Sequence, residues 1–311
     1  ARMPAMASPL PAAGATPPAR NWAIAALISH PAVVDAKNGQ PPPWPLFDSH
    51  VHLDDPGLTG IDRILRTAQE SGLVGVVSAG YGPEREAAAA ALVRPGRALW
   101  RTVGLHPWWL ANAADDGARE AGLRWLRSAL DAPGVVGVGE IGLDATRRKQ
   151  LAIGPQRHFF AAGLALAAEH NLPVVLHIVR WHGHALEALA TVPPLGGVVH
   201  RYGGPADLVS AYVDRGLAIS LCTDALKRPD HFAAVARAIP VESLLIETDW
   251  PLDEESYPDA LKELRSLVGM LAVWRRESVG GLVAQLHDNA RRVFGVDEID
   301  PITMWGKGDS D

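Results

Sequence analysis

Short apolar runs typical of buried strands recur eight times along this chain, and segments with helical spacing separate them. Strands that read as continuous apolar runs and alternate with helices predict a parallel sheet covered on its outer face. Eight such units in about 250 residues favour an α/β fold, the TIM (β/α)8 barrel, over an open doubly wound sheet. The runs are PLFDSH, LVGVVSAG, ALWRTVGL, VVGVGEIGL, LPVVLHI, GGVVH, GLAISL and SLLIETDW.

The segment after the first run supports this choice of fold. A dinucleotide-binding sheet would carry a glycine-rich G-x-G-x-x-G turn there, whereas this chain has DSHVHL. Two helical stretches around residues 257–276 and 278–293 close the pattern. In the motif NARRVFG at the end of the second stretch, we expect Asn289, Arg292 and Phe294 to lock this helix onto the barrel.

The chain divides into one predicted domain and two flanking segments. Residues 1–43 are rich in Ala and Pro, and such a stretch buries little surface, so we expect a flexible N-terminal extension. Residues 44–296 form the predicted barrel domain, and residues 297–311 form an acidic C-terminal tail.

Charge and cysteine content narrow the range of partners. The 311 residues carry a formal net charge of -6, so the chain lacks the global positive field that attracts nucleic acid. Bound metal ions could still supply positive charge locally.

The single cysteine, Cys222, excludes an intramolecular disulfide, and its apolar neighbours predict a buried thiol. No apolar run approaches the roughly 18 residues that span a bilayer, so we expect a cytoplasmic protein without membrane contact. The sequence leaves the oligomeric state open.

Ionisable side chains lie at the C-terminal ends of the predicted strands, the face on which TIM-barrel active sites are built. Such side chains are costly to bury without partners, and a pair of divalent metal ions would supply those partners. The residues are His50 and His52 on the first strand, His106 after the third, Glu140 on the fourth, His177 on the fifth, His200 on the sixth and Asp249 on the eighth.

Spacing suggests how these side chains would be used. His50 and His52 are two residues apart in a strand, so both imidazoles point to one side and can reach one metal. Glu140 stands between glycines, where its carboxylate could approach two cations and bridge them. His177 and His200 follow neighbouring apolar runs and could complete a second metal position. Asp249 is expected to ligate a metal and to accept a proton from the attacking water.

Three further residues are candidates for contact with substrate. His106 could touch the substrate without binding metal, or it could have a structural role only. Arg180 follows the fifth strand and could clamp an anionic group, and Arg147 lies in a basic run that could meet a phosphate. A charge run is also compatible with a solvated surface. Glu247, just before Asp249, could support the neighbouring loop.

Seven motifs, in this order, resemble the TatD family of metal-dependent hydrolases over residues from about 47 to 295. They are DSHVHL, GLHPWW, GEIGLD, PVVLH, VVHRYGG, ETDWP and NARRVFG. The resemblance implies two divalent metal ions, with Mg²⁺, Mn²⁺ and Zn²⁺ as candidates. It implies that His50, His52, Glu140 and Asp249 hold one metal, that Glu140, His177 and His200 hold the other, and that His106 lies near the substrate. The activity that it implies is deoxyribonuclease, with single-stranded DNA as the candidate substrate and no covalent intermediate.

The chain departs from the family pattern in loops that surround the predicted site. Where the family usually reads H-C-F-x-G, this chain has His200, Arg201, Tyr202 and two glycines. After ETDWP it carries the acidic run of Asp253, Glu254 and Glu255, which would repel a DNA backbone if it faced the site. Hydrolysis of an amide, ester or lactone in a small molecule or aminoacyl-tRNA therefore stays open as an alternative. A third possibility is a metal-retaining scaffold that binds a partner through the proline-rich extension.

Overall fold

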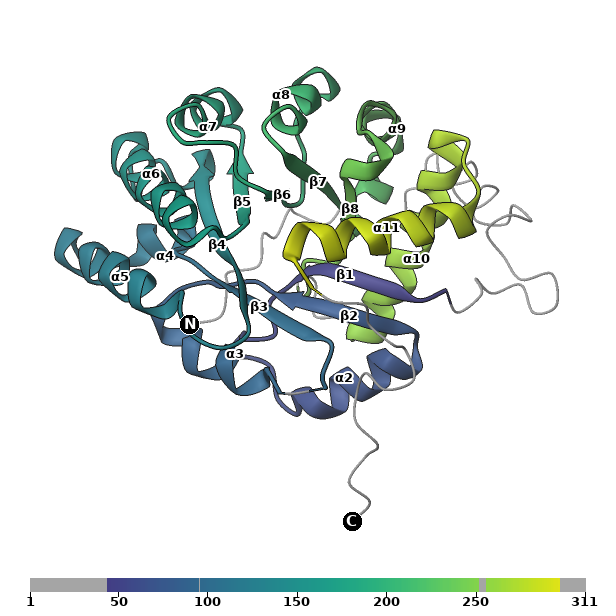
Figure 1. Ribbon diagram of the computed structural model, residues 1–311, viewed down its shortest axis with the longest axis horizontal. Helices are drawn as coiled ribbons and strands as arrows, with labels where there is room; N and C mark the ends of the chain where they lie inside the picture. Colours follow the sequence, from purple (N-terminus) through teal and green to yellow (C-terminus); the bar gives the residue numbers. More distant parts are fainter. Residues whose placement is uncertain (1–43, 95, 252–255, 297–311) are drawn as a thin grey trace, which may run out of the picture.

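The computed structural model describes residues 44–94, 96–251 and 256–296. Over these residues, eight parallel strands follow one another in chain order in a single sheet, with helices between them (Figure 1). This is the TIM (β/α)8 barrel that the sequence predicted. The strands are β1 (Leu46–Val51), β2 (Leu73–Ser78), β3 (Leu99–Val103), β4 (Val135–Asp144), β5 (Val174–Val179), β6 (Gly197–Val199), β7 (Leu217–Cys222) and β8 (Leu244–Glu247).

The end of β1 meets the segment that directly follows β8. Val51 and Trp250 form an isolated parallel bridge between the two segments. The backbone N–H of Asp249 donates to the carbonyl of His50 at 2.9 Å, and the N–H of His52 donates to the carbonyl of Trp250 at 2.7 Å. These bonds place the end of β1 directly beside the segment that follows β8.

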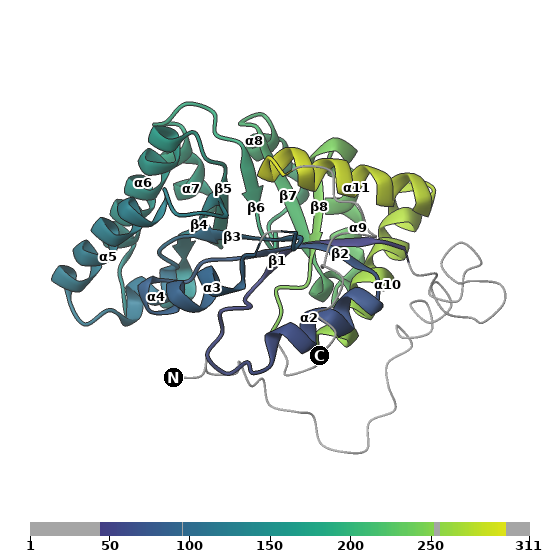
Figure 2. The same ribbon diagram turned by 60° about the horizontal axis from the view of Figure 1, so that its bottom comes forward.

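Helices surround the sheet and cover its apolar outer face (Figures 1 and 2). The described α-helices are α2 (Ile61–Glu70), α3 (Glu86–Leu92), α4 (Pro107–Asn112), α5 (Asp116–Ala129), α6 (Ile153–His170), α7 (His182–Leu189), α8 (Val209–Val213), α9 (Pro229–Ala238), α10 (Tyr257–Arg275) and α11 (Val279–Phe294). Short 3-10 turns are η1 (Pro83–Arg85), η2 (Ala145–Arg147), η3 (Ala206–Leu208), η4 (Thr223–Lys227) and η5 (Val241–Ser243).

Helix α11 packs against the end of the barrel opposite to the predicted site. It begins after Ser278, whose side chain accepts from the N–H of Gly281, and its last residue, Phe294, is followed by Gly295 with φ 61°. These are a side-chain N-cap and a left-handed C-terminal glycine. Ala290, Val293 and Phe294 belong to one apolar cluster with inward-facing strand residues. The strand residues of this cluster are Phe47, Val77, Val175, Val198, Ala218 and Leu245.

The NARRVFG motif has the structural role that the sequence predicted. Asn289 is fully buried and its amide donates to the carbonyls of Val241 at 2.7 Å and Leu244 at 2.8 Å. Arg292 bonds the carbonyl of Glu242, and Phe294 is buried. This helix is therefore tied to the start of β8.

Several sequence expectations concern residues outside the described part of the chain. The extension over 1–43, the tail over 297–311, and the acidic run of Asp253, Glu254 and Glu255 all lie there. Among the described helices, none combines the length and apolar character needed to cross a bilayer.

Candidate active site at the mouth of the barrel

Glu140 stands at the centre of a buried cluster of histidines. One carboxylate oxygen, Oε1, lies 3.5 Å from Nε2 of His50 and 3.2 Å from Nε2 of His52. The other, Oε2, lies 2.7 Å from Nε2 of His200 and 3.3 Å from Nδ1 of His177. The carboxylate therefore faces one histidine pair with each oxygen, which is the arrangement that a bridging group between two cations requires.

The position of Glu140 within its strand differs from the expectation. Both Glu140 and His177 lie inside their strands instead of at the ends, because β4 and β5 pair as far as Asp144 and Val179. The shorter β3 stops pairing with β4 at Val103, so Glu140 is nevertheless at the open mouth on that side. Where a strand stops pairing depends on the lengths of both neighbouring strands, and the sequence of one strand does not contain this information.

Glycines allow the backbone to approach closely around Glu140. A Cβ atom at Gly142, where φ is 156°, would collide with the carbonyl of His177 on β5. A Cβ atom at Gly104 would collide with the carbonyl of Glu140 itself. Small residues on both sides thus let β4 sit where its carboxylate reaches histidines from several strands.

Asp249 completes the group on the side of β1. Its Oδ1 lies 3.6 Å from Nε2 of His50 and 3.4 Å from Nε2 of His52. Burial by itself would raise the pKa of Asp249, but a hydrogen bond with His52 and the charge of Arg201 outweigh it and hold the pKa below its ordinary value. Asp249 is consequently a carboxylate at neutral pH, with one oxygen directed at the histidine pair.

Asp48 holds β1 and the segment after β8 in this register. It is fully buried and accepts hydrogen bonds from Thr248 Oγ1 at 2.6 Å, Thr248 N–H at 3.0 Å and Tyr257 at 3.0 Å. Burial raises the pKa of Asp48 to about 7 against the opposing effect of these bonds. Asp48 thereby fixes Thr248, which precedes Asp249, and its Oδ1 also accepts from the backbone N–H of His50 at 3.3 Å.

Asp144, at the end of β4, contacts His177 with one carboxylate oxygen and caps the following turn with the other. Its Oδ2 lies 3.2 Å from Nε2 of His177 and accepts from Trp108 Nε1 at 2.7 Å. Its Oδ1 caps the turn η2 by accepting from the N–H of Thr146 at 2.7 Å. Because Asp144 engages Nε2 of His177, the other ring nitrogen, Nδ1, is turned towards Glu140 and His200.

His106 lies at the edge of the cluster and has a structural bond as well. Its Nδ1 accepts from the backbone N–H of Trp108 at 2.9 Å and so caps α4. Its Nε2 lies 3.6 Å from Oε2 of Glu140, and burial lowers the pKa of the ring well below its ordinary value. A neutral histidine that accepts at Nδ1 carries its proton on Nε2, so His106 faces the site as a hydrogen-bond donor.

Glu247 was expected to support a loop, and it also contacts the site histidine His200. It is fully buried, and its Oε1 accepts from the N–H of Arg201 at 2.5 Å and lies 3.4 Å from Nδ1 of His200. Its Oε2 has no hydrogen-bond partner among the described residues. Glu247 lies two residues before Asp249, the same spacing as between His50 and His52. This spacing was the feature of the sequence that could have indicated a place for Glu247 in the site.

The two arginines expected near substrate differ in their surroundings. The guanidinium of Arg147 is half-buried and lies 3.8 Å from the ring centre of Trp108, which in turn bonds Asp144. Arg180 is exposed at the end of β5 and has φ 67°. Arg180, Arg201 and Asp249 are non-glycine residues with positive φ at the mouth of the barrel, and such backbone conformations are concentrated at functional sites.

The donor set fits divalent cations. Buried polar atoms normally have a hydrogen-bond partner, yet several in this cluster have none among the described residues. These atoms are His50 Nδ1 and Nε2, His52 Nδ1, Glu140 Oε1, His200 Nδ1 and Glu247 Oε2. Three groups bring their ligand atoms within 4.8 Å of one another: His50, His52 and Glu140; His106, Glu140 and His177; and His50, His200 and Glu247. The proton on Nε2 of His106 makes it the least suitable donor to a metal.

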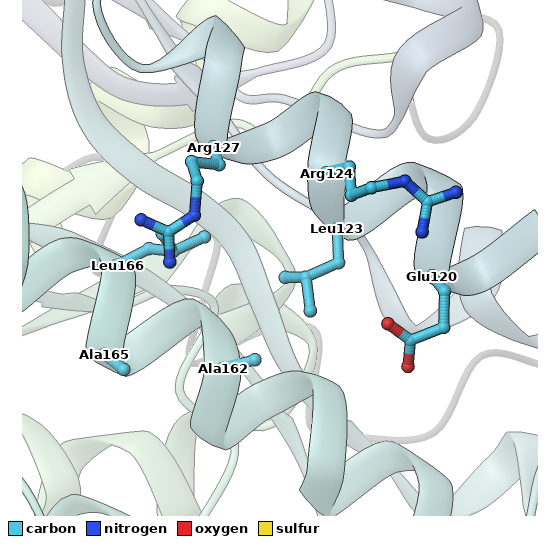
Figure 3. Close-up of a pocket in the computed structure, with 7 residues that line it drawn as sticks. All are labelled: Glu120, Leu123, Arg124, Arg127, Ala162, Ala165 and Leu166. Atoms are coloured by element: carbon cyan, nitrogen blue, oxygen red, sulfur yellow. The ribbon is translucent and has the colours of Figure 1, made fainter.

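A separate hollow of about 390 Å³ lies on the outside of the barrel (Figure 3). Residues of α5 and α6 line it, including Arg124, Arg127, Ala162 and Leu166. None of the clustered histidines or carboxylates borders this hollow. It is therefore distinct from the site at the barrel mouth.

A (β/α)8 barrel with histidines and carboxylates gathered at its mouth defines the class of this protein as a barrel enzyme with a candidate metal centre. A family profile described as TatD related DNase matches residues 47–295. The chain belongs to this family. Membership and the buried His/Glu groups together imply the use of divalent metal.

Individual relatives agree with this assignment. The chain is 31% identical to a protein named 3'-5' ssDNA/RNA exonuclease TatD from Pantoea vagans, over 80% of this chain and 99% of the relative. A protein of the same name from Yersinia pseudotuberculosis is 32% identical over 75% of this chain and 92% of the relative. Among solved structures, a TatD homologue from Escherichia coli K12 superposes with a TM-score of 0.70 at 28% identity, covering 81% of this chain and 98% of that one.

Proposed function

We propose that this chain is a metal-dependent exonuclease that hydrolyses phosphodiester bonds of single-stranded DNA from the 3' end. The observation that carries the proposal is the position of Glu140, with one oxygen towards His50 and His52 and the other towards His177 and His200. The names of relatives that align over most of the chain support the substrate and the polarity.

The residues around Glu140 divide into two candidate metal positions. His50, His52, Glu140 and Asp249 would hold one cation, and Glu140, His177 and His200 would hold the other. Two bound divalent cations, with Mg²⁺, Mn²⁺ or Zn²⁺ as candidates, would supply the Lewis acidity that activates water and neutralises charge on the phosphoryl group. Glu247, beside His200, would steady that imidazole from the far side of the site.

The remaining steps belong to side chains of the chain itself. Asp249 accepts a proton from the attacking water, since its carboxylate is buried, ionised and adjacent to the histidine pair. His106 donates through Nε2 to an oxygen of the substrate, because its Nδ1 is occupied by the N–H of Trp108. Arg147, stacked on Trp108, and Arg180, exposed just after β5, are the groups that would contact phosphates of the strand.

Digestion of a 5'-labelled single-stranded oligonucleotide in Mn²⁺ or Mg²⁺ tests this function. We expect a ladder that shortens from the 3' end, and a 3'-terminal phosphorothioate should block it while a 5'-terminal one should not. Chelation should abolish the products. A protein that carries bound metal and yields no product would contradict the nuclease and direct the search to amide, ester or lactone substrates.

A further inference from the structure

Arg201 is held in a strained position beside the site. It directly follows His200 and has φ 44°, a left-handed conformation that is costly for a residue with a side chain. Its backbone N–H donates to the buried carboxylate of Glu247 at 2.5 Å. A fixed backbone at this point aims the side chain across the mouth towards the segment that follows β8.

The guanidinium of Arg201 joins two carboxylates from different loops. Nη1 donates to Oδ2 of Asp249 at 2.9 Å. Nε and Nη2 both donate to Oδ2 of Asp224, on η4 after β7, at 3.3 and 3.1 Å. A planar guanidinium can span two acceptors in this way, whereas a lysine ammonium is a single point of charge on a flexible stem.

The contact with Arg201 gives the two carboxylate oxygens of Asp249 different partners. Oδ2 is engaged by the guanidinium, while Oδ1 faces Nε2 of His50 and His52. The Asp249 side chain is only 6% exposed, so water cannot hold Oδ2 in place of the arginine. The carboxylate is therefore fixed in a rotation that presents a single oxygen to the histidine pair.

Resting on the proposed function, we propose that Arg201 is a positioning residue that sets how Asp249 meets the metal and the attacking water. Asp224 anchors the outer side of the guanidinium and keeps it from swinging into solvent, since the Arg201 side chain is 38% exposed. Groups that orient the ligands of a metal typically change metal affinity or activity by about 10–100-fold when they are removed. Arg201 acts in this way through Asp249.

A competing role for the same contact predicts the opposite change in metal affinity. If the guanidinium competed with a cation for Asp249, its removal would free the carboxylate and strengthen metal binding. If it positions Asp249, its removal leaves a buried carboxylate free to rotate and weakens metal binding. The two roles predict changes of opposite sign.

Titration of metal-stripped protein with Mn²⁺ by calorimetry distinguishes them. Arg201→Gln should lower Mn²⁺ affinity by about 10–100-fold. With single-stranded DNA at saturating Mn²⁺, kcat should fall by more than KM rises. Arg201→Lys should recover part of both losses because it keeps a positive charge next to Asp249 but cannot span to Asp224. Asp224→Asn, which loosens the guanidinium without touching Asp249, should shift Mn²⁺ affinity in the same direction by a smaller factor.

Arg127→Gln is the matched control. Arg127 bonds Glu169 at 2.7 Å on the outer helices, beside the hollow of Figure 3, so the same substitution breaks the same kind of pair away from the site. Its Mn²⁺ affinity, melting temperature and kcat should equal those of the wild type. Unchanged or tighter Mn²⁺ binding by both Arg201→Gln and Asp224→Asn would overturn the positioning role. If the wild type binds Mn²⁺ but cleaves no DNA, and both variants bind Mn²⁺ more weakly than the wild type, the positioning role is supported and only the nuclease function is overturned. A wild type that binds no divalent cation would overturn both.

Discussion

Asp249, the proposed general base, has a different partner for each of its carboxylate oxygens. One of its oxygens faces two histidines, and the other is held by Arg201. Its backbone is fixed by a hydrogen bond to His50, and its φ of 55° is that of a strained residue. Such a carboxylate is suited to accept a proton from a water that lies on the histidine side.

Replacing Asp249 by Asn keeps the size of the side chain and removes its basicity. We expect kcat on single-stranded DNA to fall by about 10²–10⁴-fold, the usual contribution of a general base, while much of the metal is retained. Metal content by mass spectrometry and single-turnover rates check this, with the exposed Glu169→Gln as control. Full activity in Asp249→Asn would remove this residue as the base.

Much of the site could be anticipated from single residues, and some of it could not. Polar side chains that interrupt apolar strands identified His50, His52, Glu140, His177 and His200, because burial of such groups needs a reason. The Nδ1 bond of His106 to a turn of α4 and the reach of Arg201 to Asp249 depend on how loops fold over the mouth. Contacts between residues 48 positions apart leave no local pattern.

At the scale of elements, helix α11 shows how the barrel is held from the end opposite to the site. Its residue Asn289 bonds the carbonyls of Val241 and Leu244, at the start of β8. The motif predicted this role correctly, since an amide within an apolar helix face requires buried partners. The end of β4 was less predictable, because pairing with β5 extends that strand past Glu140.

Asn289→Ala tests whether α11 stabilises the barrel through its bonds to the start of β8. Two buried carbonyls would lose their donor, so we expect the free energy of unfolding to fall by about 1–3 kcal/mol. Folded molecules should keep the wild-type kcat, because the residue touches no group at the mouth. Urea denaturation and initial rates measure the two quantities, with the neighbouring exposed Asp288→Ala as control. A large loss of kcat with unchanged stability would mean that α11 is coupled to the site.

In the whole molecule, the barrel brings together seven side chains that lie on six strands or in the loops directly after them, and all seven are buried or nearly so. Their sequence separation extends from His50 to Asp249, and only closure of β1 onto the segment after β8 unites them. Asp48 strengthens that closure through Thr248 and Tyr257. The fold class followed from the eightfold alternation of strands and helices, and the convergence of the cluster follows from the fold.

Metal stoichiometry tests the proposal that Glu140 would hold two metal ions, one with each carboxylate oxygen. Wild-type protein and Glu140→Ala would be stripped, reloaded with Mn²⁺, and measured by elemental analysis beside circular dichroism. We predict about two ions per wild-type chain and a clear loss in Glu140→Ala, with the helical signal unchanged and nuclease activity abolished. A Glu140→Ala variant that retains the wild-type complement of metal and the wild-type rate would show that Glu140 is not a metal ligand.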